Sequence, residues 1–244
     1  MRIGVLQAGL VAEDLAADWG EYDRFFERLL GLTGADFEVR GWRVVDGEFP
    51  PRPEAADGWI ISGSKHGVYE DHAFIPPLEA FIRAVVAAKR PLIGVCFGHQ
   101  IMAQALGGKA EKSAKGWGLG LHEYALTARP GWMRDAPESL VLPAVHQDQV
   151  VMPPPEATRL ATSPFCENAL LAYGDPERPW AISIQPHPEF TAPFARTLIE
   201  LRRGAPFPES RSDAALKTLA GEAPRHHGDW AAGWFRDFFE MHKK

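Results

Sequence analysis

The sequence predicts an α/β fold, with a mostly parallel central sheet flanked by helices and a smaller antiparallel portion. Two observations support this prediction. Up to residue 108, apolar strand-like runs alternate with amphipathic helical segments, which is typical of parallel βαβ units. After residue 116, short strand-like pieces follow one another between Pro and Gly turns, which favours antiparallel pairing. We expect these later strands to form a second half that packs on the first.

The elements follow in order from the hydrophobic spacing. The sequence predicts strands at 2–7, 37–45, 58–62 and 92–95, and helices at 13–30, at 75–88 and directly after Cys96. In the second half it predicts strands at 119–127, 139–142, 168–173 and 180–185, a helix at 191–203, an irregular segment at 204–228 and a helix at 229–242. We interpret residues 1–203 as one domain and residues 204–244 as an extension.

The last predicted helix is rich in aromatic residues. Trp230 and Trp234, Trp234 and Phe238, and Phe235 and Phe239 are each four positions apart, so these five residues share one face of the helix. So much aromatic surface favours burial in a folded protein. We expect the extension to pack on the same domain; the alternative is that its aromatic face binds a partner protein or a second copy.

Composition narrows the class of protein. The chain has 244 residues, 45% of them hydrophobic, and a formal net charge of −6. This balance argues against a nucleic-acid partner, which calls for a basic surface. We find neither an apolar run long enough to span a membrane nor the features of a signal peptide, and expect no membrane partner. With only two cysteines, Cys96 and Cys166, we expect a cytoplasmic protein with reduced thiols.

The most informative segment is 91–108. An apolar strand leads into Gly94-Val-Cys96-Phe-Gly98, and the helix that follows ends at Gly107 and Gly108. This is the pattern of a nucleophile elbow, in which a tight strand-to-helix turn presents the nucleophile. The helix N-terminus favours the thiolate, the reactive form, and the N–H of Phe97 can donate to an oxyanion. The alternative is that Cys96 is a small packed core residue, the interpretation we prefer for Cys166.

A candidate base follows another apolar strand, in the segment Gln185-Pro-His187-Pro-Glu189. Residues two apart on an extended chain point to the same side, and the flanking prolines favour an extended chain. Glu189 can therefore fix the tautomer of His187 and leave its other nitrogen for a thiol. The alternative is a solvated histidine at a strand end. A metal site at His226 and His227 lacks further spaced ligands, so we expect no metal.

Taken together, these motifs resemble the class I (triad) glutamine amidotransferases, and among them the stand-alone GMP-synthase-like members and the γ-glutamyl peptidases. The resemblance covers about residues 2–200 and rests on the segments 60–64, 94–100, 115–120, 146–150 and 185–189. It implies a flavodoxin-like fold, catalysis by Cys96, His187 and Glu189, and a second oxyanion N–H from Ser64. It also implies substrate binding by Gly63, Gln100, His146 and Asp148. Gly118 departs from the family pattern, since a glutamate is common there in stand-alone members.

The implied reaction is hydrolysis of the γ-carboxamide of glutamine, or of a related γ-glutamyl amide or peptide, through a thioester on Cys96. It requires no cofactor. The released ammonia or amine either leaves or passes to a separate synthetase subunit, because the chain has no phosphate-binding loop of its own. Two alternatives remain: a catalytically idle regulatory or binding protein on the same fold, and an α/β-hydrolase with a cysteine nucleophile.

Overall fold

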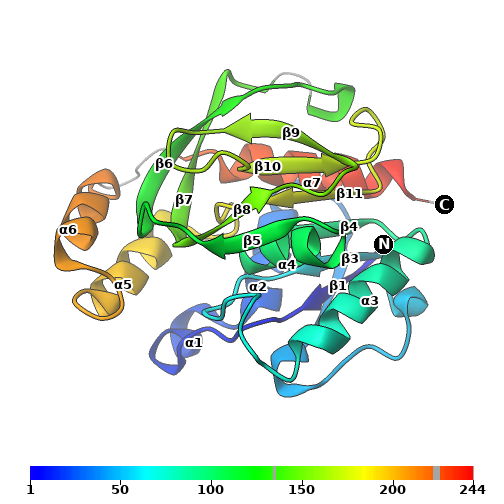
Figure 1. Cartoon of the computed structure of the whole chain (residues 1–244), viewed down its shortest axis with the longest axis horizontal. Helices are drawn as coiled ribbons and strands as arrows, with labels where there is room; N and C mark the ends of the chain where they lie inside the picture. Colours follow the sequence, from blue (N-terminus) through cyan, green and yellow to red (C-terminus); the bar gives the residue numbers. More distant parts are fainter. Residues whose placement is uncertain (134–135, 222–225, 244) are drawn as a thin grey trace.

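The computed structural model describes residues 1–133, 136–221 and 226–243. Within these residues, one nine-stranded sheet runs through the molecule in the order β2-β1-β3-β4-β11-β10-β9-β6-β7, and β5 pairs with β8 in a separate two-stranded sheet (Figure 1). Strands β2, β1, β3, β4 and β11 are parallel, whereas each later neighbour is antiparallel. The predicted fold class is confirmed.

The strand bounds are β1 (Arg2–Leu6), β2 (Glu38–Trp42), β3 (Gly58–Ile61), β4 (Leu92–Val95), β5 (Lys109–Lys112), β6 (Gly118–Leu126), β7 (Ser139–His146), β8 (Asp148–Met152), β9 (Ala157–Thr162), β10 (Leu170–Tyr173) and β11 (Ala181–Ile184). The helices are α1 (Glu13–Trp19), α2 (Tyr22–Gly31), α3 (Ile75–Ala87), α4 (Phe97–Ala105), α5 (Ala192–Arg202), α6 (Glu209–Thr218) and α7 (Gly228–Met241). Short 3₁₀ helices lie at Val44–Asp46, Pro53–Ala55 and Gly131–Met133.

Helices cover both faces of the parallel strands. Alternate residues of a strand point to opposite faces, so Ile60 joins the core under α2 and α7 while Trp59 and Ile61 join the core under α3 and α4. Helices α5 and α6 pack together against β6, beyond the parallel part of the sheet. Burial on both faces explains why the parallel strands read as short, continuous apolar runs.

The structure corrects several sequence-based predictions. The helix predicted at 13–30 is two helices, because Gly20 has a positive φ of 78° and ends α1. The segment predicted to be irregular contains α6, whose Ser212 and Ala215 are buried. Strands β5, β8 and β9 were missed; β5 reads Lys-Ala-Glu-Lys, so pairing with β8 rather than its own hydrophobicity makes it a strand.

The antiparallel strands also differ from prediction. They do not pack as a second half on the first, because β10 pairs directly with β11 and so extends the same sheet. Strand β7 continues to His146, four residues past its predicted end, as a long ladder with β6. This extension carries the β7–β8 turn, and with it His146, toward the end of β4.

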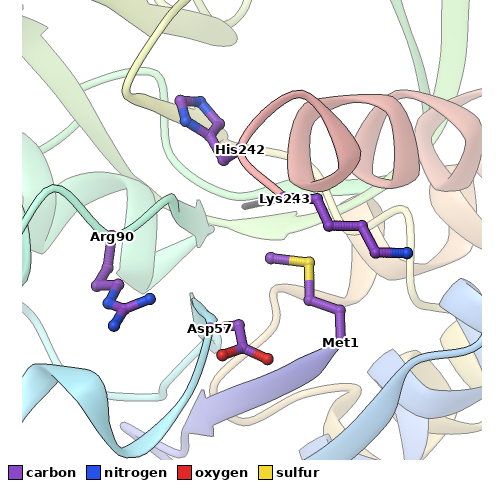
Figure 2. A pocket seen from close by; sticks show the side chains of 5 residues that line it. All are labelled: Met1, Asp57, Arg90, His242 and Lys243. Atoms are coloured by element: carbon purple, nitrogen blue, oxygen red, sulfur yellow. The ribbon is translucent and has the colours of Figure 1, made fainter.

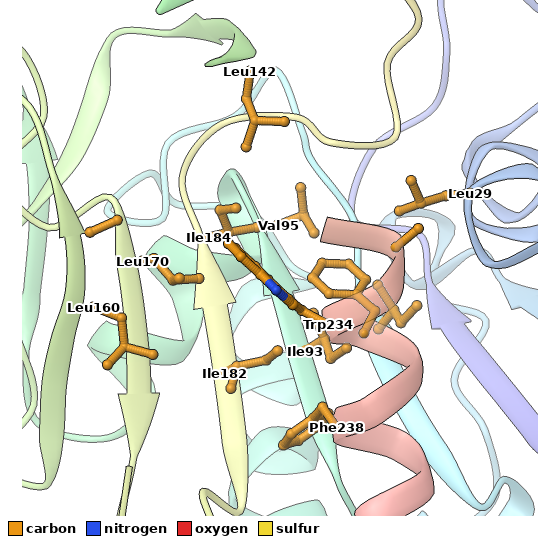
Figure 3. Packing of buried hydrophobic residues seen from close by; sticks show 14 of the residues in the cluster. Leu29, Ile93, Val95, Leu142, Leu160, Leu170, Ile182, Ile184, Trp234 and Phe238 are labelled. Atoms are coloured by element: carbon orange, nitrogen blue, oxygen red, sulfur yellow. The ribbon is translucent and has the colours of Figure 1, made fainter. Parts of the chain in front are cut away.

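Helix α7 packs against the central sheet of its own chain. Figure 3 shows Trp234 and Phe238 against Ile93 and Val95 of β4 and residues of the neighbouring strands. Trp234, Phe235, Phe238 and Phe239 are all at most 3% exposed.

In the part of the chain that the structure describes, no helix is both long and apolar enough to cross a membrane.

Candidate functional site

The candidate site forms where three neighbouring parallel strands end. β4 lies between β3 and β11, so Cys96 directly after β4 comes close to the turns that follow the other two strands. The Cys96 N–H donates to the Ile184 carbonyl of β11 at 2.9 Å, and the Gly98 N–H donates to the Ser62 carbonyl after β3 at 3.1 Å. The carboxyl ends of strands in an open α/β sheet are the usual place for a ligand.

The backbone at Cys96 has the geometry of a nucleophile elbow. Cys96 has a φ of 54° and a ψ of −104°, a conformation that residues with a side chain rarely adopt. The glycines on either side permit it: a Cβ on Gly94 would lie 2.5 Å from the Gly98 carbonyl oxygen, and one on Gly98 would lie 2.3 Å from that of Ile61. The thiol therefore stands at the N-terminus of α4.

His187 and Glu189 meet, but not on the predicted extended chain: residues 188–189 form a turn in which the backbone N–H of Phe190 donates to the His187 carbonyl at 3.3 Å. Nδ1 of His187 lies 2.7 Å from Oε1 of Glu189, and the two side chains are 4% and 0% exposed. The Phe190 ring stacks on the imidazole at 4.1 Å, with only 3° between the ring planes. The backbone N–H of His187 donates to the Pro143 carbonyl at 2.8 Å. The imidazole is thus held in one orientation.

Opposing effects set the protonation of His187. Burial lowers its pKa, but the charges of Glu189 and Cys96 and their hydrogen bonds to the ring outweigh burial and raise the pKa to about 10. The cysteine and the carboxylate therefore both favour an imidazolium. A protonated His187 beside Cys96 is a ready proton donor to a leaving group.

This shift predicts how stability depends on pH. The pKa of His187 is higher in the folded protein than its unfolded value of about 6.5. The protonated His187 therefore stabilises the folded state fully below pH 6.5, and this stabilisation is lost as the pH rises toward 10. Compared with wild type, His187→Gln should lack a downward slope of up to about 1.4 kcal/mol per pH unit. Urea denaturation at pH 9, 9.5 and 10 measures it, because below about pH 8.5 the unfolded chain still holds on its thiol the proton that the folded thiolate–imidazolium pair holds on His187. His226→Gln is the control, and equal slopes in all three proteins would contradict the shift.

The two N–H groups expected at the oxyanion position lie beside Cys96. Among the described residues, no acceptor is found for the backbone N–H of Phe97 or of Ser64. Gly63 lies between the candidate residues, because a Cβ there would be 2.9 Å from Cε1 of His187 and 3.8 Å from Cβ of Cys96. A glycine at 63 therefore leaves the space next to the thiol open.

Gln100, His146 and Asp148 form a connected wall of the site. The Gln100 amide donates to the Asp148 carbonyl at 2.9 Å and to Oε1 of Gln185 at 3.1 Å, so both of its N–H groups serve the protein itself. Nδ1 of His146 donates to the same Asp148 carbonyl at 3.1 Å, which leaves Nε2 buried without a partner among the described residues. Burial lowers the pKa of His146 to about 3, so this Nε2 is an acceptor.

Comparison with known proteins agrees with this geometry. Residues 21–199 match the family model of glutamine amidotransferase class-I. The chain belongs to this family. It is 31% identical to γ-glutamyl peptidase 3 of Arabidopsis thaliana over 78% of this chain and 77% of that protein. It is 34% identical to one subunit of the glutamine-hydrolysing GMP synthase of Methanospirillum hungatei, over 43% of this chain and 54% of that one.

A solved structure extends the likeness to the whole fold. The structure of a glutamine amidotransferase from Thermotoga maritima superimposes with a TM-score of 0.73 at 20% identity and covers 100% of this chain and 99% of that one. This likeness in fold continues beyond residue 199, where the match to the family model ends.

The candidate site opens into a cavity of about 880 Å³. Its lining includes Cys96, His187, Tyr22 and residues of the segment from Ser64 to His72. It also includes Trp117 directly before β6, Leu198 and Arg202 of α5, and Phe207 of the α5–α6 connection. A second cavity of about 200 Å³, between Asp57, Arg90 and the two chain ends, lies at the opposite edge of the sheet, where the parallel strands begin (Figure 2).

Sequence reasoning missed Tyr22 and Phe190. Tyr22 begins α2, far from the motifs in sequence, and burial together with the nearby charges of Glu189 and Cys96 raises the pKa of its hydroxyl. The two rings stack at 6.5 Å and close one side of the His187 pocket. An aromatic residue directly after Pro-Glu189 was a usable signal for Phe190; no local signal marks Tyr22.

Other singled-out residues lie outside the site. Cys166 is 1% exposed, and burial raises the pKa of its thiol to about 12, so it is a packed, unreactive group. His227 accepts from the Val141 N–H at 3.0 Å and so has a structural role. His99 is fully buried beside Oγ of Ser183 at 2.7 Å, and burial lowers its pKa to about 3.

Proposed function

We propose that the protein hydrolyses the γ-amide bond of a γ-glutamyl amide or peptide, with Cys96, His187 and Glu189 as the catalytic triad. The observation that carries this is the thiol of Cys96, presented on a nucleophile elbow, hydrogen-bonded to the imidazole of His187 and lining a large cavity. The membership of the class-I glutamine amidotransferases supports the same chemistry.

In the first half of the proposed reaction, the Cys96 thiolate attacks the γ-carbonyl carbon and forms a C–S bond. The N–H groups of Phe97 and Ser64 hold the resulting oxyanion. When the tetrahedral intermediate collapses, the C–N bond breaks and the His187 imidazolium gives its proton to the departing amine. The product is a γ-glutamyl thioester and a neutral His187.

In the second half, His187 takes a proton from water, and the hydroxide attacks the thioester carbon. The C–S bond breaks, glutamate leaves, and the thiolate–imidazolium pair is restored. Glu189 orients the imidazole throughout and stabilises its positive charge. This cycle requires no metal or organic cofactor. A thiolate nucleophile must stay reduced, so we place the protein in the cytoplasm.

The size and lining of the cavity favour an amine larger than ammonia. At about 880 Å³ the cavity is large for glutamine alone, and ligand sites of roughly 300–1,000 Å³ hold much larger molecules. Trp117 and Phe207 pack edge to face at 4.7 Å and present apolar surface away from Cys96. We assign this surface to the amine side of a γ-glutamyl conjugate, in line with the γ-glutamyl peptidase among the relatives.

The test is an assay of the whole chain alone against glutamine and a series of γ-glutamyl amides with small and aromatic amines. We expect kcat/KM to be highest for the aromatic amides. Trp117→Ala should then lower kcat/KM about tenfold for the aromatic amides and little for glutamine. The loss of one hydrophobic contact to the substrate costs about 1–3 kcal/mol, which corresponds to a fold-change of this order. Trp230→Ala, on α7 outside the cavity, is the matched control. Equal effects on all substrates would contradict the assignment.

A second candidate function is supply of ammonia to a separate synthetase subunit. The similarity to a GMP synthase subunit favours it, because that name describes a glutamine-hydrolysing enzyme made of separate subunits. In this case the chain alone should be inactive on every γ-glutamyl amide and should hydrolyse only glutamine once its partner is present. Activity of the chain alone on aromatic amides decides for the peptidase reaction.

The triad assignment predicts an order of effects. His187→Ala removes the group that moves the proton, whereas Glu189→Gln keeps a hydrogen-bonding partner at 2.7 Å from Nδ1 and removes only its charge. We therefore expect Glu189→Gln to lower kcat less than His187→Ala does. Both are measured at one pH on protein with native circular dichroism. A Glu189→Gln variant as fast as wild type would show that another group orients His187.

A further inference from the structure

A cluster of potential metal ligands lies at the rim of the cavity, outside the proposed triad. His66, Glu70 and His72 come from the segment between β3 and α3, and one ligand atom from each lies within 4.8 Å of the others. Oε2 of Glu70 is 2.7 Å from Nε2 of His72 and 3.6 Å from Nδ1 of His66. The two imidazole centroids are 4.0 Å apart.

We propose that His66, Glu70 and His72 bind a divalent transition-metal ion of the zinc type. Two imidazole nitrogens and one carboxylate oxygen are a donor set that suits Zn²⁺, Co²⁺ or Ni²⁺, and sites with three protein ligands keep an open position. With metal–ligand distances of about 2.0–2.2 Å, tetrahedral ligand atoms lie roughly 3.3 Å apart. The observed separations require only small side-chain rotations, which these half-buried and exposed side chains permit.

The surroundings favour a cation at this place. Glu70 lies close enough to Asp148 for each negative charge to act on the other, and the Tyr69 hydroxyl donates to the Asp148 carboxylate. Lys65 is the opposing charge, and its side chain is exposed and free to turn outward.

The position links the metal to the active-site rim. All three ligands line the cavity that contains Cys96. Ser64, two residues before the first ligand, accepts the His66 N–H on its Oγ at 3.2 Å. An ion bound to the three side chains would therefore fix the segment from Ser64 to His72, and its open position would face water or a ligand carboxylate at the rim.

The test is a Co²⁺ titration of the whole chain, without a histidine tag, in a Cys96→Ser background. That background removes the thiolate, which would itself bind cobalt. We expect one Co²⁺ per chain, with visible d–d bands and no thiolate charge-transfer band. His66→Ala and His72→Ala should each raise the Kd at least about tenfold, and Glu70→Gln should raise it as well. His226→Ala, outside the cluster, should leave the Kd unchanged.

Zn²⁺ provides the second measurement. It should raise the Tm of Cys96→Ser by several degrees and leave the Tm of the added His66→Ala/His72→Ala double variant unchanged, because only a metal bound to the native state stabilises it. Two results would overturn the proposal. One is a folded Cys96→Ser protein that binds no Co²⁺; the other is binding of equal strength in the double variant.

Discussion

Cys96→Ala is expected to lower the rate of γ-glutamyl amide hydrolysis by roughly 10⁴-fold or more, because loss of a catalytic nucleophile removes the covalent route altogether. Cys166→Ala should retain nearly full activity. Cys166 is buried in the core rather than in the cavity, and burial raises its pKa to about 12, so little thiolate exists there at neutral pH. Steady-state assays on folded protein measure both effects.

Labelling with a glutamine-like electrophile gives the same contrast without turnover. The reagent should modify Cys96 and spare Cys166, as peptide mass mapping would show. Equal losses of activity in the two alanine variants, with folding preserved, would contradict the assignment of the nucleophile. Labelling of Cys96 without hydrolysis of any amide would instead favour the alternative of a catalytically idle binding protein.

Removal of α7 is expected to have the largest effect on stability. Truncation after Gly228 would expose the strand residues that Trp234, Phe235, Phe238 and Phe239 cover, and the shortened chain should aggregate. The milder Phe238→Ala should lower the free energy of unfolding by about 3–5 kcal/mol, the usual cost of a large aromatic cavity. Urea denaturation of the full-length variant measures it. We propose on this basis that residues 204–244 fold with residues 1–203 as one unit.

Glu240→Ala is the matched control on the same helix, because Glu240 is exposed and should change stability by at most about 0.5 kcal/mol. A truncated chain that stays in solution with an unchanged Tm and full activity would refute the packing argument. In that case the aromatic face of α7 would have to serve a partner protein or a second copy.

Local patterns predicted the elements of the site that depend on a few neighbouring residues. Gly94, Cys96 and Gly98 define one tight turn, and its internal geometry follows from their spacing. The pairing of His187 with Glu189 was also predicted, but they lie in a turn closed by the Phe190 N–H rather than in the predicted extended chain. That the two segments meet depends on β11 lying next to β4, although residues 96–180 separate these two strands along the chain. Only the resemblance to a known family predicted that meeting; the pattern of strands did not.

Features that depend on distant contacts were not predictable in this way. Helix α6 has a weak apolar face and forms against β6, and Gly20 divides a helical pattern that reads as continuous. Tyr22 reaches the site because α2 packs over β1 and β2, a fact of tertiary structure. The histidines of the rim cluster are not consecutive, and it is the turn between β3 and α3 that brings them together.

The backbone at Cys96 has a consequence for evolution and for design. A φ of 54° with a ψ of −104° costs of order 1–3 kcal/mol for any residue with a Cβ, and glycine would relieve much of it. A procedure that selects sequences for thermal stability alone would therefore place glycine at position 96. The resulting protein would be more stable and would lack the proposed nucleophile. The strained backbone at Cys96 is what we expect at a position where the proposed chemistry, rather than stability, decides which residue is used.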